Sequence, residues 1–440
     1  MKARKQSLFA LTIPIFLELM LITVVGNVDT IMLGRFSDQA VGAVGGMSQI
    51  LTIQTVILNF ISLGSSILIA QYIGANNEDG IKKTISVSII MNLLLGAIIG
   101  LIYFFCWKWI LIKINLPPHL IDIGKIYFKM VGGLCIFQGV TLTCSAIMKS
   151  FGNTKQMLFV NVGINLLNIL GNGMFIFGWF GAPILGVNGV GLSTVISRLI
   201  GAIVAIIVTM KYCNFKFSYF KKFSFKIAKH ILSIGIPTAG EYLSWSMAQV
   251  IILAMVNTMG TIEIAARTYL ALISLFIMNF SIALGNGTAI QVGQLVGAKE
   301  KEKAYTQCLN SAKLSFIAAA IVSIIVILLK KEIMTMFTKD PAVLHAAYKV
   351  FAWMLLIETG RTLNIVIINS LNASGDVKFP VTMGIISMYG VAVPLCWLLG
   401  IKFQMGLIGI WLGNAADEWL RGIIMLYRWK SKKWTKKSFI

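Results

Sequence analysis

Twelve long apolar segments constrain this chain more than any other feature of its sequence. Each is about 18 residues or longer, the length that an α-helix needs to cross roughly 30 Å of hydrocarbon. The connections between them are short and polar, such as "ANNEDGIKK" at residues 75–83. We therefore predict an all-α polytopic membrane protein with transmembrane helices at residues 8–34, 41–72, 84–107, 120–148, 156–179, 184–210, 230–258, 263–295, 309–329, 342–371, 378–400 and 405–428.

The composition agrees with a chain that lies mostly in lipid. Of its 440 residues, 57% are hydrophobic and only 12% are charged, and the mean hydropathy is +0.84. A soluble protein has roughly 45–50% apolar and about 25% charged residues. This excess of apolar residues excludes an ordinary soluble fold.

Basic residues are distributed unequally between the two ends of the predicted helices. If the N-terminus is cytoplasmic, 23 Lys and Arg residues fall on the cytoplasmic side and 8 on the opposite side. The positive-inside rule then places both termini in the cytoplasm of a multi-pass cell-membrane protein. Although the net charge is +22, the basic residues lie at membrane ends, where anionic lipid attracts them. We therefore expect lipid contact and no nucleic-acid partner.

Neither the cysteines nor the N-terminus indicates a secreted or metal-binding protein. The six cysteines are scattered, without metal-ligand spacing or a disulfide framework. The basic "MKARK" precedes an apolar run that is too long for a signal peptide and has no small-residue cleavage site. We expect this run to remain as the first membrane helix.

An internal repeat relates the two halves of the chain. "IPIFLE" at residues 13–18 returns as "IPTAGE" at 236–241, and "QYIGA" at 71–75 returns as "QLVGA" at 294–298, with the same spacing in both pairs. Gly152 and Lys155 correspond to Gly375 and Lys378 at this spacing too, while "LGVNGVGL" returns as "MGLIGIWL" after a slightly shorter interval. Each repeat therefore contains six predicted helices.

An even number of helices makes the second repeat enter the membrane from the same side as the first. Parallel repeats of this kind occur in transporters, which bind substrate at the repeat interface and rock one half against the other. We predict an N-terminal six-helix lobe at residues 1–210 and a C-terminal lobe at 230–440. Between them, residues 211–229 form a basic, aromatic cytoplasmic linker that is expected to lie on the lipid surface.

Ionisable and amide residues inside the predicted helices mark candidate sites, because a charge at the bilayer centre costs at least ~2.5–3.5 kcal/mol. Glu18 and Asp29 are eleven residues apart, which is three helical turns plus ~20°, so both carboxylates share one face. Another polar stripe, at spacings of four, three and four, consists of Asn161, Asn165, Asn168 and Asn172. The two stripes suggest a hydrated or cation-coordinating pocket between helices.

Purely structural roles are open for each of these residues. The Asn stripe is also typical of interhelical hydrogen bonding, and Asp29 and Glu241 could be acids held by polar neighbours without a transport role. Glu358 and Arg361, at i and i+3, can pair with each other. Asp417, Glu418 and Arg421 can do the same.

The motif "IPIFLE...VDTIMLGRFSDQAVGA", with "QYIGA" and "QLVGA", resembles the multidrug and toxic compound extrusion (MATE) family over essentially the whole chain. The residues that carry the first motif are Pro14, Asp29, Gly34, Arg35 and Asp38. The resemblance implies two six-helix lobes around a central cavity. It also implies a secondary antiporter, not an enzyme, that exports amphipathic and often cationic compounds in exchange for inward Na⁺ or H⁺.

The resemblance also implies the site residues. Asp29, Asn168, Asn172 and Thr194 correspond to the family's cation site, with Na⁺ at the first three residues in particular, and Glu241 corresponds to an acid for substrate or protons. We also expect Glu18, Glu358 and Arg361 to contact substrate or protons. Asn172 stands where some members have Asp, so this site has one formal negative charge unless Glu18 contributes. Arg361, with Glu358 one turn earlier, stands where some members have an acid. These departures leave the coupling ion and a second cation site open.

Several other functions remain as alternatives. A lipid-linked precursor flippase of the same wider superfamily would need a more cationic cavity, to which Arg198, Arg267, Arg361 and Arg421 could contribute. An intramembrane enzyme is disfavoured because the three histidines lie near membrane ends, and the repeat does not support a channel or receptor. We expect a monomer that takes small organic substrates and needs no cofactor beyond the coupling ion.

Overall fold

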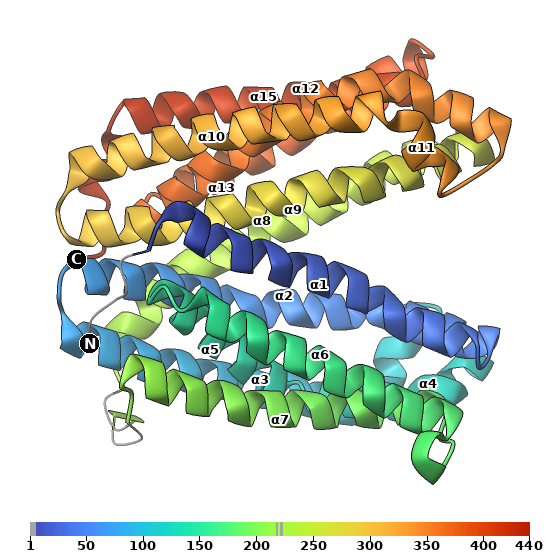
Figure 1. The fold of residues 1–440 in the computed structure, drawn as a ribbon, viewed down its shortest axis with the longest axis horizontal. Helices are drawn as coiled ribbons and strands as arrows, with labels where there is room; N and C mark the ends of the chain where they lie inside the picture. Colours follow the sequence, from blue (N-terminus) through green and yellow to red (C-terminus); the bar gives the residue numbers. More distant parts are fainter. Residues whose placement is uncertain (1–5, 217–218, 221–222) are drawn as a thin grey trace. The chain divides into compact units, whose positions relative to one another are not determined.

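The computed structural model describes residues 6–216, 219–220 and 223–440, and over these ranges the chain is helical without a β-strand (Figure 1). Predicted features that lie outside these residues are the basic residues of the extreme N-terminus and two linker lysines, Lys221 and Lys222. Two compact units are present. Unit 1 contains Leu17–Gly235, and unit 2 contains Ser7–Phe16 together with Ile236–Ile440.

Six membrane segments precede the linker. The first is a continuous helix, the fourth is divided in two, and a 3₁₀ turn follows the fifth. In order they are α1 (Leu8–Gly34), α2 (Asp38–Gly74), α3 (Glu78–Lys113), α4 (Pro118–Gly133) with α5 (Ile136–Ser150), α6 (Thr154–Phe177) with η1 (Trp179–Gly181), and α7 (Val187–Cys213).

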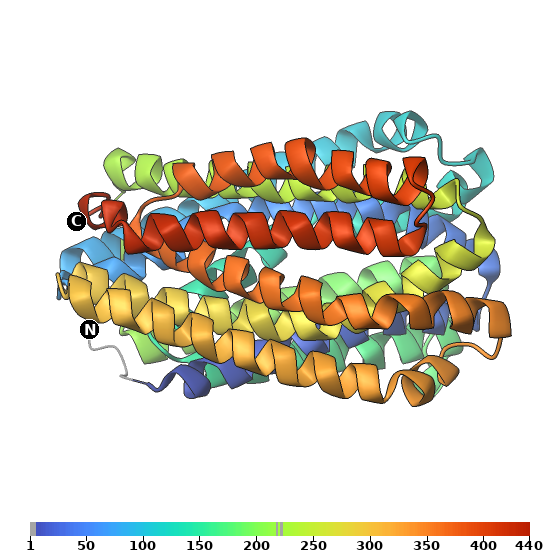
Figure 2. The same ribbon diagram turned by 90° about the horizontal axis from the view of Figure 1, so that it is seen from above.

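The second half repeats this order. Its first four segments are α8 (Phe225–Asn257), α9 (Thr261–Gly297), α10 (Lys301–Leu328) with the short α11 (Lys330–Thr335), and α12 (Pro341–Ser374). The fifth segment consists of α13 (Lys378–Ser387), η3 (Met388–Ala392), α14 (Val393–Leu395) and η4 (Cys396–Lys402). The sixth is α15 (Leu407–Lys430), which η5 (Lys433–Lys436) follows. Figure 2 shows α15 beside the fifth segment, against which it packs. In this unit α12 packs against α9, α10 and α15.

The predicted polytopic membrane fold is confirmed. Among the described residues, ten helices are long and apolar enough to cross a membrane, and α4 with α5 forms an eleventh span bent by 42°. The twelfth predicted span is α15, whose 24 residues are long enough to cross. Its apolar character is lowered by Asp417, Glu418 and Arg421.

The bend between α4 and α5 was not predicted from the sequence, in which residues 120–148 read as one span. It follows Gly132 and Gly133, whose low helix propensity weakens the helix there. Opposite this joint, a side chain on Gly100 of α3 would collide with the Gly133 carbonyl oxygen. Glycine at position 100 therefore allows the two backbones to approach closely.

Two helices are divided between the units: α1 begins in unit 2 and continues in unit 1, and α8 begins in unit 1 and continues in unit 2. Phe16 of α1 packs edge-to-face on Phe280 of α9 in unit 2, with ring centroids 5.6 Å apart. Gly235 of α8 lies against the backbone of Phe60 in unit 1. Both changes of unit occur close to a proline, Pro14 in α1 and Pro237 in α8, where one helical hydrogen bond is missing. The lobe boundaries 1–210 and 230–440 stay a prediction.

Candidate cation and substrate sites

Asp29 of α1 faces α6, where Asn172 is its partner. The Asn172 side-chain amide donates a hydrogen bond of 2.6 Å to Asp29 Oδ1. Asn172 is fully buried, and its own side-chain oxygen has no hydrogen-bond partner within the described chain. The pair therefore offers a carboxylate and an unused amide oxygen at one place.

Asn168 lies one turn before Asn172 on α6 and faces α7. Its side-chain amide donates to Thr194 Oγ1 at 3.2 Å, and its backbone carbonyl accepts from Ser193 Oγ at 2.8 Å. The Thr194 hydroxyl in turn donates to the Val190 carbonyl at 2.8 Å. Three helices thus bring the four predicted residues together as two bonded pairs, one turn apart on α6.

These two pairs suit a hard monovalent cation better than a transition metal. Among the described residues, no three His, Cys, Asp or Glu side chains form a metal-binding group. What unit 1 supplies here is one carboxylate with amide and hydroxyl oxygens, the ligand type that hard cations prefer. A proton bound to the Asp29 carboxylate would neutralise the same negative charge.

Arg198 is a neighbour of Asp29 that the sequence pattern did not reveal. It lies one turn after Thr194 on α7, and its guanidinium is close enough to act electrostatically on the Asp29 carboxylate and the Tyr127 hydroxyl. One of its terminal nitrogens is buried without a hydrogen-bond partner in the described chain. The sequence did contain a signal for this neighbour, because Arg198 follows Thr194 by four residues and therefore lies on the same face of the helix.

Glu18 has a different environment from Asp29, although both face α6. Lys149 of α5 and the side-chain amide of Asn161 each donate to Glu18 Oε1 at 2.9 Å. The ammonium balances the charge of this buried carboxylate, so Glu18 does not add an uncompensated charge to the Asp29 site. In the Asn stripe, Asn165 donates to the Asn161 carbonyl of its own helix at 2.8 Å and contributes nothing to another helix through that bond.

A network of ion pairs and hydrogen bonds lies in the interior of unit 2. Arg361 Nη1 donates to Glu358 Oε1 at 2.7 Å, and Arg361 Nε donates to Glu418 Oε1 at 3.3 Å. Ser274 of α9 donates to the same Glu358 oxygen, and Asn364 donates to Glu418 at 2.9 Å. The predicted pairing of Glu358 with Arg361 is therefore present, and it extends from α12 to α15.

Further residues of α15 extend this network. Arg421 Nη2 donates to Asp417 Oδ2 at 2.6 Å and lies 3.3 Å from Glu418 Oε2. The Ser387 hydroxyl of α13 donates to Asp417. Both arginines of the network thus have carboxylate partners. The i, i+3 spacing of Glu358 and Arg361 in α12 and the i, i+3 and i, i+4 spacings in α15 predicted this pairing.

Glu241 of α8 lies beside this network without joining it through an ion pair. Its carboxylate is near enough to Arg421 and Glu418 for electrostatic interaction. A Cβ on Gly384 of α13 would lie only 2.8 Å from Glu241 Oε1, so the glycine leaves the room that this carboxylate fills.

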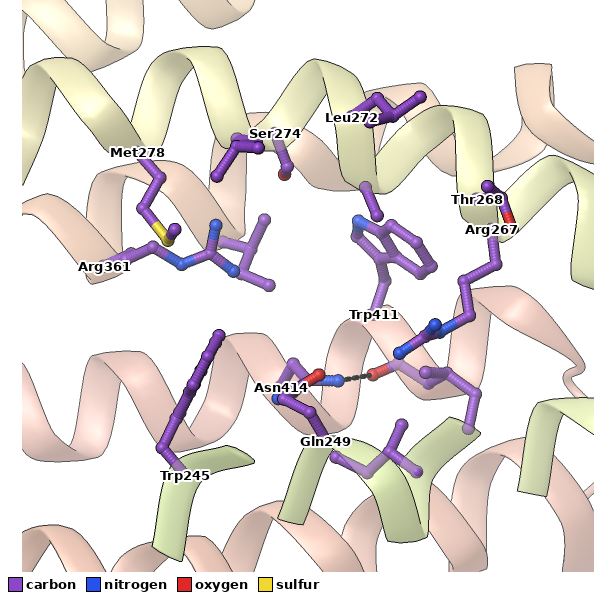
Figure 3. A pocket seen from close by; sticks show the side chains of 15 residues that line it. Trp245, Gln249, Arg267, Thr268, Leu272, Ser274, Met278, Arg361, Trp411 and Asn414 are labelled. Carbon is purple, nitrogen blue, oxygen red and sulfur yellow. Dashed lines mark hydrogen bonds between the residues drawn. The ribbon is translucent and has the colours of Figure 1, made fainter. Parts of the chain in front are cut away.

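A cavity of about 380 Å³ opens within unit 2, lined from α8, α9, α12 and α15 (Figure 3). Trp245 and Gln249 contribute from α8, Arg267 from α9 and Trp411 from α15. From the sequence, Arg267 was expected only as one of several intramembrane arginines. The pocket itself depends on the packing of four helices and was not predicted.

Comparison with known proteins identifies the family. Residues 14–174 and residues 237–398 each match the MatE family model, and the two matches begin at the same separation that relates Glu18 to Glu241. The chain belongs to the MATE family. The double match agrees with the internal repeat, and the MATE family comprises transporters, so this chain is a transporter and not an enzyme.

Relatives of this MATE protein cover nearly its whole length. It is 40% identical over 434 residues to the uncharacterized transporter YisQ of Bacillus subtilis, covering 98% of this chain and 95% of that protein. It is 27% identical over 445 residues to the probable multidrug resistance protein NorM of Thermotoga maritima, covering 99% and 94%. The crystal structure of a MATE protein in the bent conformation has the same fold, with a TM-score of 0.87 at 18% identity over 97% of this chain and 94% of that one.

Proposed function

We propose that this MATE transporter exports amphipathic, often cationic organic compounds in exchange for inward Na⁺ or H⁺. The observation that carries the proposal is Asp29, an intramembrane carboxylate whose direct partner is a neutral amide and which makes no ion pair among the described residues. Intramembrane acids of this kind are typical of ion and proton pathways. Family membership supports multidrug export, while the coupling cation and the substrate class are our inference.

Binding of a cation at Asp29 would change the charge of unit 1. The proposed ligands are the Asp29 carboxylate, the side-chain oxygens of Asn168 and Asn172, and the Thr194 hydroxyl. A buried uncompensated charge is costly, so the loaded and empty states should favour different arrangements of α1 and α6. A cation gradient can drive export only through such a difference in affinity between two states.

Na⁺ and H⁺ make different demands on these residues. Na⁺ would need the amide and hydroxyl oxygens as additional ligands, and the unused Asn172 oxygen is suited to this role. H⁺ would need Asp29 alone. Arg198 opposes both cations through its charge, and removal of this charge is expected to strengthen cation binding.

Export would proceed by alternating access of the two lobes, with both termini in the cytoplasm and one chain as the working unit. Substrate attraction is assigned to Glu241, with Glu358 and Arg361 supporting it through the network. Because Arg361 and Arg421 are both paired with carboxylates, they add little to the cationic cavity that a diphosphate-lipid flippase would need. Export of smaller amphipathic compounds is therefore the function that we favour.

Transport by the purified protein in liposomes tests the proposal. Efflux of a cationic dye such as ethidium should be driven by an inward Na⁺ gradient at equal pH, or by an inward proton gradient without Na⁺. Liposomes without protein provide the background. If neither gradient drives dye movement while the protein is inserted and folded, the proposed function is wrong.

A further inference from the structure

Lys129 of α4 is an ionisable residue on a membrane-spanning segment that takes no part in the sites described above. It makes no ion pair or hydrogen bond among the described residues. Its ammonium lies instead over two aromatic rings of α3, with Nζ 4.8 Å from the ring centroid of Trp107 and 5.5 Å from that of Phe104. Aromatic faces attract a cation, but the three N–H donors of the ammonium still need an acceptor. A membrane lysine in this state indicates a partner outside the chain.

The rings that hold Lys129 border a surface of α3 that contacts lipid. Four apolar residues at spacings of four, three and four lie on one side of this helix, and each is more than half exposed: Leu94, Ile98, Leu101 and Phe105. A continuous exposed apolar face on a spanning helix is typical of lipid contact. Phe104 packs edge-to-face on Phe105, with ring centroids 5.4 Å apart. The Lys129 ammonium therefore lies at the edge of the lipid-facing surface of unit 1.

The position of Lys129 along the helices brings its ammonium toward the lipid headgroups. Trp107 lies six residues before Lys113, the last residue of α3, and so about 9 Å from that end of the helix. Helical side chains lean toward the N-terminus of their own helix, so Lys129 extends along α4 toward Pro118, on the same side of the membrane. Lysines near helix ends reach the interface in this way. In the orientation that we propose, this is the extracellular leaflet.

A second lysine lies one turn nearer to this membrane surface on the same face of α4. Lys125 pairs with Asp122 at 3.1 Å, and the two side chains are 42% and 75% exposed. Because an exposed ion pair contributes little, Lys125 is free to bind another acceptor. Together with Lys129, these residues of α4 carry a net charge of +1, which matches one phosphodiester.

We propose that this surface of unit 1 binds one anionic phospholipid, such as phosphatidylglycerol. Lys129 and Lys125 donate to the phosphate oxygens, and the acyl chains lie along the apolar face of α3 toward the membrane centre. A zwitterionic phospholipid binds less tightly, because its own ammonium competes with the lysines for the phosphate. Phe104 also contacts the joint between α4 and α5, since a Cβ on Gly133 would lie 3.7 Å from its ring. The bound lipid therefore stabilises the bent segment of unit 1.

Lipid binding to the delipidated protein in detergent, measured by native mass spectrometry, gives the first test. The probes are phosphatidylglycerol and phosphatidylcholine with the same acyl chains. We expect phosphatidylglycerol to bind the wild type about tenfold more tightly, because charge-assisted hydrogen bonds favour the anionic lipid. Equal binding of the two lipids would overturn the proposal. Displacement of phosphatidylglycerol by millimolar inorganic phosphate would assign the lysines to a soluble anion and would also overturn it.

Variants locate the site. Lys129→Gln should weaken the binding of one phosphatidylglycerol about tenfold, and Trp107→Leu, which removes one ring from the ammonium, about threefold. Lys129→Arg keeps the charge and should bind nearly as the wild type does, which separates charge from folding. Lys339→Gln removes an exposed lysine before α12 on the same side of the membrane and should change nothing. Unchanged phosphatidylglycerol binding in Lys129→Gln would contradict the assignment.

Thermal stability provides an independent measurement of the same site. Phosphatidylglycerol should raise the thermal midpoint of the wild type and of Lys339→Gln more than that of Lys129→Gln. An equal rise in all three would place the lipid elsewhere and overturn the proposal. None of these measurements uses a gradient, so the lipid site and the proposed export function fail separately.

Discussion

Glu18 and Glu241 occupy equivalent positions of the two repeats, but their surroundings differ. In unit 1, Glu18 accepts from both Lys149 and Asn161. The equivalent positions in the second repeat hold Asn372 and Gly384, and Gly384 again lies directly against the glutamate. The repeat therefore kept the carboxylate and its neighbouring helix position but replaced the charged partner with a neutral residue and the amide donor with a glycine.

Asp29 of the first repeat, by contrast, has no acidic counterpart in the second repeat. Its equivalent in the second repeat is Ile252, and the equivalent of Asn172 is Leu395, so the candidate cation site exists in unit 1 alone. Each unit then contains one membrane carboxylate that makes no direct ion pair among the described residues, Asp29 in unit 1 and Glu241 in unit 2. We infer that the units divide the work, with cation coupling in unit 1 and substrate attraction in unit 2.

The largest expected effect is that of Asp29→Asn. This change keeps the size of the side chain and removes the charge that reports cation binding, so gradient-driven dye efflux in liposomes should fall to the level of liposomes without protein. Asp38→Asn, at the exposed start of α2, is the matched control and should transport normally. Cation-stimulated efflux by Asp29→Asn at wild-type abundance would show that the carboxylate is only structural.

A strong effect on stability is expected in the unit 2 network. Arg361→Gln leaves Glu358 and Glu418 buried without their shared cation, and breaking such a buried ion pair costs about 3–5 kcal/mol. The thermal midpoint of the detergent-solubilised variant should fall well below that of the wild type. The double variant Arg361→Gln with Glu358→Gln should recover part of the loss. A midpoint unchanged in the single variant would mean that the network does not hold unit 2 together.

A more selective effect is expected from Glu241→Gln. Because Glu241 is a carboxylate without a direct ion pair in the described chain, we expect export of cationic dyes to fall several-fold while export of neutral dyes changes little. Glu263→Gln, in the first turn of α9, serves as the control. Equal loss for both kinds of dye, with normal expression, would assign Glu241 to coupling or folding and would break the proposed division between the units.

The smallest effect is expected from Thr194→Ala. The Thr194 hydroxyl is one neutral ligand among several, and a single hydrogen-bonding group contributes about 1 kcal/mol. The cation concentration for half-maximal efflux should rise about fivefold, with the maximal rate unchanged. Thr194→Ser keeps the hydroxyl and should restore the wild-type value. An unchanged half-maximal concentration in Thr194→Ala, with Na⁺ and with H⁺ alike, would exclude Thr194 from the site.

The sequence predicted those features that depend on a bilayer or on a single helix. Long apolar runs located the helices because each must span the same hydrocarbon thickness. The pairs Glu358 with Arg361 and Asp417 with Arg421 followed from i, i+3 and i, i+4 spacing. The constant spacing between matching motifs predicted the repeat that the double family match confirms.

Contacts between segments that are distant in the sequence could not be predicted from hydropathy or helical spacing. The partner of Glu18 is 131 residues away, and hydropathy does not fix the depth or rotation of α5 against α1. The same limit applies to Arg198 beside Asp29 and to the cavity around Arg267, which four helices form together. The bend between α4 and α5 depends on the close approach of Gly100, which no local pattern in the sequence indicates.

Direct cation binding by purified protein tests the central assignment, that the coupling cation is held at Asp29. Radiolabelled Na⁺ binding and proton release on raising the pH would be measured in the same preparations of wild type, Asp29→Asn and Glu241→Gln. We predict that Asp29→Asn loses one bound Na⁺ or one releasable proton per chain, while Glu241→Gln retains the cation that Asp29→Asn loses. Wild-type cation binding by Asp29→Asn would contradict the account.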